Sequence, residues 1–195
     1  MRSRDQLRSL LRDHDDPRHL DVPRDYDPWA TVGRFTRLTE AFEGRFGPSC
    51  RTGLYQDASV HGVVRVPAAA TGLGRPLWAE LSNFGGFVTA GTGDAWDTPG
   101  AAEGLPAECV AWLDAACAAA GCVFVPLDLL LEPYDGPSPT WADEDAALVR
   151  ALEAADEPVA DENDENDEND KSDENDKDDK EEARPVWADR YFQWV

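Results

Sequence analysis

The sequence predicts an α+β domain, with a small, mainly antiparallel sheet flanked by helices. Three observations predict it. The strand-like segments cluster between residues 51 and 89, ahead of the last two helical segments. Apolar residues recur at helical spacing in some segments and alternate in others. Hydrophobic residues make up 42% of the 195 residues, which is enough to bury a core.

The N-terminal part contains two helical segments and a connector. Leucines at helical spacing give residues 3–13 an apolar face, and a connector broken by prolines follows. Asp27 then resembles an N-cap, with Pro28 at the first helical position, and predicts a helix to about residue 45. We therefore separate an N-terminal helix and connector, residues 1–26, from an α+β core at residues 27–160.

Strands are expected next, as a meander of three or four. Residues 51–67 are rich in Val and Tyr and form one strand, or two with a turn near residues 56–59. Val64 and Val66 share one face. Residues 77–81 alternate, and a turn signal at residues 82–86 leads into a further strand.

The rest of the core is expected to be helical, with one buried strand. A helix should run from Pro106 through Ala120, and Gly121 is a fitting C-cap. Residues 122–126 predict a buried strand, and residues 141–155 predict the last helix.

The last residues are the most aromatic part of the chain. They include Trp187, Tyr191, Phe192 and Trp194. A solvated tail would not need these side chains, so we expect residues 183–195 to return to the core as a strand.

An acidic repeat precedes this aromatic end. Residues 161–182 hold 14 acidic residues and three lysines, and Asp-Glu-Asn recurs in register. A polar repeat cannot bury apolar surface, and like charges at helical neighbours oppose a helix. We expect a disordered insert. It could mimic nucleic-acid phosphate, bind divalent cations weakly, or be a solvated loop with little function.

The charge of the chain indicates its partners. The net charge is −22, and the acidic repeat accounts for 14 − 3 = 11 of these negative charges. The remaining −11 belongs to the rest of the chain, so the domain itself is acidic. Such a domain repels nucleic acid and anionic membranes and attracts basic proteins. Solubility alone is the competing explanation.

The four cysteines form no C-x-x-C pair, and no apolar stretch has the length of a signal peptide or a membrane span. We expect a cytoplasmic protein with reduced thiols.

Catalytic and metal-binding motifs are not evident. His14 and His19 lack a defined ligand spacing, so we expect no metal and no cofactor. A P-loop is excluded because all three lysines lie in the acidic repeat. His61, with Asp57 four residues earlier, could form a base–carboxylate pair, but a strand-edge histidine that hydrogen-bonds to the backbone is the favoured interpretation.

Three segments carry a family resemblance: Leu54–Val64, Trp78–Gly85 and Trp187–Phe192. They resemble small bacterial proteins of immunity type, the cytoplasmic partners of polymorphic toxins, over roughly residues 30–155 and the last ten. The resemblance implies a non-catalytic acidic α+β protein that neutralises one toxin by covering its active site or a nearby surface. A basic, nuclease-type toxin would fit the charge.

Tight binding to a protein would need aromatic anchors, and loop aromatics beside acidic residues are the candidates. They are Trp96, Tyr134 and Trp141, with the neighbouring acids Asp94, Asp97 and Asp135. Two other hypotheses stay open: an acidic interaction or structural domain without catalysis, and an enzyme that uses His61. The oligomeric state stays undetermined.

Overall fold

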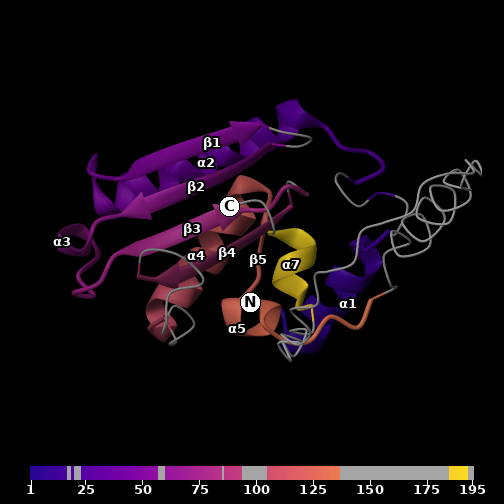
Figure 1. Cartoon of the computed structure of the whole chain (residues 1–195). Helices are drawn as coiled ribbons and strands as arrows, with labels where there is room; N and C mark the ends of the chain where they lie inside the picture. Colours follow the sequence, from indigo (N-terminus) through magenta and orange to yellow (C-terminus); the bar gives the residue numbers. More distant parts are fainter. Residues whose placement is uncertain are drawn as a thin grey trace, which may run out of the picture. The chain divides into compact units, whose positions relative to one another are not determined.

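A five-stranded sheet organises the fold, in the order β1-β2-β3-β4-β5 (Figure 1). Strands β1 to β4 pair antiparallel in sequence order, and β5 pairs parallel with β4. The strands are β1 (Arg51–Gln56), β2 (Val60–Val66), β3 (Leu77–Leu81), β4 (Phe87–Thr92) and β5 (Val123–Phe124). The predicted α+β class, the mainly antiparallel sheet and the meander are confirmed.

The computed structural model describes residues 1–16, 19, 23–56, 60–84, 86–93, 105–136 and 185–192. These residues belong to one compact unit formed by residues 1–137 and 185–195. The helix predicted at residues 141–155 and the acidic repeat at residues 161–182 lie outside the described residues.

Two long helices cover one face of the sheet. They are α2 (Pro28–Phe46) and α4 (Ala107–Ala120), which lie behind the strands in Figure 1. Their apolar side chains pack against alternate residues of β2, β3 and β4, because only every second side chain of a strand points to this face. The main members of this core are Phe35, Leu38, Phe42, Val64, Val66, Leu77, Ala79, Leu81, Leu113 and Cys117.

The ends of both helices match the predicted capping signals. Asp27 caps α2, since its side chain accepts from the backbone N–H groups of Trp29 and Ala30. Gly121 ends α4 at φ 81°, a left-handed conformation that glycine adopts without a steric penalty. The guanidinium of Arg37 donates to the Ala120 carbonyl, and so satisfies a further group at the same helix end.

A second core gathers the two chain ends beside β5 (Figure 1). It joins α1 (Arg4–His14), α5 (Leu127–Leu130) and α7 (Trp187–Tyr191) to the start of β4. The buried side chains include Leu7, Leu11, Phe84, Phe87, Leu129, Leu130, Trp187 and Tyr191. The N-terminal helix is therefore part of the core. One further helical turn, α3 (Ala68–Thr71), lies between β2 and β3.

The C-terminal segment returns to the domain as predicted, but the strand expected for it is wrong. A single bridge pairs Pro133 with Val186, and the chain then forms the short helix α7. Trp187 and Tyr191 are four residues apart, and in a helix this spacing turns both rings to the same buried side. Their rings stack 6.1 Å apart.

The chain leaves and re-enters this unit at neighbouring points. The backbone N–H of Tyr134 donates to the carbonyl of Pro185 at 2.8 Å, and Trp187 donates to Glu132 at 3.3 Å. The described residues on either side of the segment that contains the acidic repeat are thus hydrogen-bonded to each other.

Candidate functional site

A cavity of about 530 Å³ opens where the end of α1, the following connector and the start of α2 meet the β3–β4 turn. Four carboxylates and three basic side chains line it: Asp13, Asp16, Asp25, Asp27, His14, Arg24 and Arg34. Phe84 and Phe87 supply apolar surface. We call it the acidic cavity. Its volume is typical of a binding pocket.

The connector side of the acidic cavity is fixed by hydrogen bonds. The phenol oxygen of Tyr26 accepts from the backbone N–H of Val60 at 2.5 Å, which ties the connector to the start of β2. Next to it, the Asp27 side chain caps α2, and the hydroxyl of the fully buried Thr31 donates to the Asp27 carbonyl. Asp25 directly precedes these anchored residues and is exposed.

Trp29 lies in the first turn of α2, between the cavity-lining residues Asp27 and Thr31 in sequence. Its exposed fraction of 83% is the largest of any large hydrophobic side chain among the described residues. An indole so exposed, two residues from a lining carboxylate, has no part in the core. Leu54 and Tyr55 are also exposed, but they lie on the edge strand β1.

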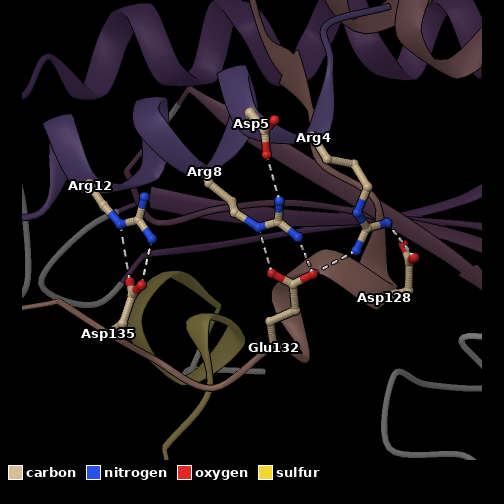
Figure 2. Close-up of polar contacts among 7 residues, drawn as sticks. All are labelled: Arg4, Asp5, Arg8, Arg12, Asp128, Glu132 and Asp135. Atoms are coloured by element: carbon tan, nitrogen blue, oxygen red, sulfur yellow. Dashed lines mark hydrogen bonds and ion pairs between the residues drawn. The ribbon is translucent and has the colours of Figure 1, made fainter.

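An arginine ladder holds α1 in place (Figure 2). Arg4, Arg8 and Arg12 recur every four residues and therefore lie along one side of the helix. Arg4 binds Asp128 at 2.6 Å and Glu132 at 2.7 Å. The carboxylates belong to α5 and the residues after it, so the ladder joins the N-terminal helix to a segment more than 120 residues later in the sequence.

Two contacts of the ladder are bidentate (Figure 2). The Arg8 guanidinium donates hydrogen bonds to both carboxylate oxygens of Glu132, each at 2.8 Å. The Arg12 guanidinium donates to both carboxylate oxygens of Asp135, at 2.5 and 3.2 Å. Hydrogen bonds from Arg8 and Arg4 lower the pKa of Glu132 to about 2. The hydrogen bond from Arg12 likewise lowers the pKa of Asp135. Glu132 is therefore fully ionised at neutral pH.

A buried network fixes the other end of α1. Asp15 accepts from Arg190 of α7 at 2.7 Å and from the hydroxyl of Tyr134 at 2.6 Å. The guanidinium of Arg190 also lies over the Phe84 ring, 4.6 Å from its centroid. Since Phe84 lines the acidic cavity, Arg190 connects α7 to the residues that form this cavity.

Two of the residues predicted to bind a partner are already engaged within the chain. Tyr134 packs edge-on against Trp187, with ring centroids 4.8 Å apart, in addition to its bond to Asp15. Asp135 is the partner of Arg12. Binding through these two residues stays a prediction.

The other four predicted residues, Trp96, Trp141, Asp94 and Asp97, lie outside the described ranges, so their role also stays a prediction.

His61, the residue of the enzyme hypothesis, lies on β2 and is 6% exposed. Its ring stacks on Tyr55 at 5.3 Å. Asp57 lies outside the described residues. Another carboxyl, Glu80 of β3, shares the sheet face of His61, because Glu80 pairs with Val63, two residues from His61. Burial raises the pKa of Glu80 to about 8.

The described residues hold no group of three or more His, Cys, Asp or Glu side chains that could bind a metal. His14 and His19 make local contacts instead. The Nδ1 atom of His14 is 2.9 Å from the Leu10 carbonyl, and that of His19 is 3.0 Å from an Asp16 carboxylate oxygen. All four cysteines are free.

Two features of this site were missed from the sequence. The spacing of Arg4, Arg8 and Arg12 was the available signal for the ladder. For Trp29, the signal is its position on the helix, since it falls opposite the buried stripe through Thr31, Phe35 and Leu38.

Comparisons with known proteins identify no relative. No protein-family model matches the chain, and no curated protein and no solved structure matches it. Among the described residues, no helix combines the length and the apolar character needed to cross a membrane.

Proposed function

We propose that this protein is a non-enzymatic inhibitor that binds one basic protein, and that the acidic cavity and Trp29 form the contact surface. The observation that carries the proposal is a cavity lined by four carboxylates, with the 83% exposed indole of Trp29 two residues in sequence from the lining residue Asp27. The finer form of the proposal is an immunity protein that neutralises a basic, nuclease-type toxin.

Charge favours a basic partner. The chain carries −22 in total, and Asp13 and Asp25 are exposed at the cavity. Exposed carboxylates at the acidic cavity attract the Arg and Lys side chains of a partner protein. This attraction accelerates association at low salt and disfavours binding of acidic proteins.

Trp29 would supply the affinity that charge does not. Tryptophan is the residue type most enriched among the energetically dominant positions of protein interfaces, because it buries a large rigid surface at low entropic cost. An arginine of the partner could also stack on its face.

The surface is preorganised. Asp27 caps α2, Tyr26 holds the connector, and the arginine ladder with the Asp15–Arg190 pair fixes α1. A surface that is ordered before binding loses less conformational entropy on association.

The test is capture of a partner from lysate of the native host with the full-length protein, followed by affinity measurements on the purified partner at low and high salt. We expect a basic protein whose affinity falls as salt rises. Trp29→Ala should weaken binding at least tenfold, and Asp13→Asn with Asp25→Asn should slow association. The matched controls are Leu54→Ala for the exposed apolar residue and Glu40→Gln with Glu43→Gln for the charges, and both should bind as the wild type does.

Two results would contradict the proposal. One is that no basic protein is retained. The other is that the Trp29 and Asp13/Asp25 variants bind with the affinity and association rate of the controls.

A further inference from the structure

Strand β1 forms one edge of the sheet (Figure 1), and no strand of the described residues pairs with its outer side. The strand at the other edge, β5, has only two residues. Proteins protect sheet edges from pairing with other chains by short strands, bulges, prolines or charged side chains. β1 has six residues in regular register with β2, no proline, and a single charged side chain, Arg51. It therefore has little of this protection.

The hydrogen bonds of the inner strands determine which backbone groups of β1 point outward. In an antiparallel sheet, the N–H and C=O of one residue point to the same neighbouring strand, and this direction alternates along the chain. The N–H of Ser82, directly after β3, donates to the carbonyl of Phe87 in β4 at 2.9 Å. The preceding residue, Leu81, consequently bonds to the strand on the other side, β2, where it pairs with Gly62.

Strand β2 continues this alternation as far as β1. Because Gly62 bonds to β3, it does not bond to Leu54, the residue of β1 that lies opposite it. The N–H of Val60 agrees with this assignment, since it points away from β1 and donates to the hydroxyl of Tyr26. The N–H and C=O of Leu54 therefore point outward from the sheet edge. The same alternation applies to the residues two positions to either side of it, Thr52 and Gln56.

The side chains of β1 leave this edge accessible. Leu54 is 45% exposed and Tyr55 is 54% exposed, and Thr52 is exposed as well. Successive side chains of a strand point to opposite faces, so Leu54 and Tyr55 present apolar surface on both faces of the sheet at its edge. An accessible strand with outward N–H and C=O groups is a template for pairing with a further strand.

A second copy of β1 fits this edge. When two copies pair antiparallel about a two-fold axis at Leu54, this residue lies opposite Leu54 of the second copy, and Thr52 lies opposite Gln56 of the second copy. Every outward N–H and C=O group of the two strands then has a partner. The exposed leucines cover each other, and the two Arg51 side chains lie at opposite ends of the paired strands.

The charge of β1 favours a second copy over a strand of a basic protein. β1 contains Arg51 and no acidic residue, so it does not attract Lys and Arg side chains. The lining of the acidic cavity, where we propose that a basic protein binds, includes no residue of β1. The two surfaces are therefore distinct in position and in charge.

We propose that two copies of this protein associate through antiparallel pairing of their β1 strands, which joins the two five-stranded sheets into one continuous sheet. This inference goes beyond the proposed function, since it concerns another surface and another partner. The contact consists of one pair of short strands, so the dimer is reversible and depends on protein concentration.

The first test is sedimentation of the full-length protein over a concentration series, at low and at high sodium chloride. We expect the mass to rise from one chain to two. Each copy carries −22, so screening by salt should strengthen the dimer, whereas it should weaken a complex with a basic protein. The opposite salt dependence distinguishes failure of this proposal from failure of the proposed function.

Two variants of β1 test the contact. Thr52→Pro removes an outward N–H without removing a bond to β2, and Leu54→Lys places a charge at the axis. We expect each to weaken the dimer at least tenfold, with circular dichroism unchanged. The matched control is Leu131→Lys, which replaces a 38% exposed leucine after α5 and adds the same charge. This control and Trp29→Ala should dimerise like the wild type.

Amide hydrogen exchange of the wild type gives a second readout that does not depend on the folding of any variant. The N–H groups of Thr52 and Leu54 should exchange fast in dilute protein and slow down as the concentration rises. Those of Gly53 and Tyr55, which bond to β2, should be protected at every concentration.

Four results would overturn the proposal. The first is a mass of one chain at every concentration in both salts. The second is a mass that grows beyond two chains, because a two-fold contact closes at two. The third is a dimer that persists in both β1 variants. The fourth is a monomeric protein whose complex with a captured partner is lost in Thr52→Pro, which would assign the edge to a strand of that partner.

Discussion

Asp15 and Arg190 form an ion pair of 2.7 Å in which the side chains are 0% and 7% exposed. The two residues are 175 positions apart in sequence. The pair joins the end of α1 to α7, and Tyr134 donates to the same carboxylate. The Asp15 carboxylate is satisfied by these two donors, and removing one member of a buried ion pair is costly.

Removing one member of this pair should destabilise the protein strongly. We expect Asp15→Asn to lower the free energy of unfolding by roughly 3–5 kcal/mol, because the buried Arg190 guanidinium would lose its ion pair with the Asp15 carboxylate. Urea unfolding followed by circular dichroism measures it. The control is Arg24→Gln, which breaks an exposed contact with Asp16 and should cost less than about 1 kcal/mol. Equal effects of the two variants would show that the buried pair contributes no more than a surface one.

The arginine ladder should weaken in acid. The folded-state pKa of Glu132 is about 2, against an ordinary value of 4.5. A lowered folded-state pKa means that the contribution of Glu132 is fully present above about pH 4.5 and is lost as the pH falls towards 2.

This pH dependence can be measured as the difference in unfolding free energy between wild type and Glu132→Gln. We expect a constant difference at neutral pH that narrows below about pH 4.5. Glu40→Gln, an exposed carboxylate on α2, controls for the loss of one negative charge. A difference that does not change with pH would contradict the role of the ladder.

Local patterns in the sequence were sufficient to predict the helices whose ends carry capping residues. Asp27-Pro28 and Gly121 mark α2 and α4 because capping satisfies backbone groups within one turn of the helix. The alternation in β2 and β3 predicted which residues face the core, since Val64, Val66, Leu77 and Leu81 are all buried in it.

Features that depend on contacts between residues far apart in the sequence could not be predicted from local sequence patterns. The segment around Trp187 and Tyr191 is too short for its periodicity to separate helix from strand, so its burial was predicted and its conformation was not. The pairing of Arg8 with Glu132 and of Asp15 with Arg190 depends on how the chain folds back. Trp29 was missed because a helical aromatic is ordinarily a core residue.

Gly62 should not tolerate a side chain. A Cβ atom at this position would lie 2.5 Å from the Phe35 ring, which packs directly over β2. We expect Gly62→Ala to cost roughly 1–3 kcal/mol through overpacking, measured by thermal or urea unfolding.

The matched control for Gly62 is Gly44→Ala, in α2. A Cβ atom there meets nothing within 4 Å, and alanine favours the helix by roughly 0.5–1 kcal/mol. The two glycine variants should therefore change stability in opposite directions. A neutral Gly62→Ala would mean that Phe35 can move away from the sheet without loss of packing.

Glu80 should make the protein less stable in mild alkali. Burial raises its folded-state pKa to about 8 from an ordinary 4.5. Between these values the folded state holds a proton that the unfolded chain releases, so the free energy of unfolding falls as the pH rises. With Glu80 3% exposed, we expect this loss to reach roughly 2–4 kcal/mol by pH 8.5.

Glu80→Gln isolates this effect, because glutamine has a similar shape and does not ionise. Near pH 5 the variant and the wild type should have similar unfolding free energies, and at pH 8.5 the variant should be the more stable. Glu43→Gln, on the exposed side of α2, should show no such crossover. If wild type and Glu80→Gln change in parallel from pH 5 to 8.5, the Glu80 carboxyl is ionised in the folded state.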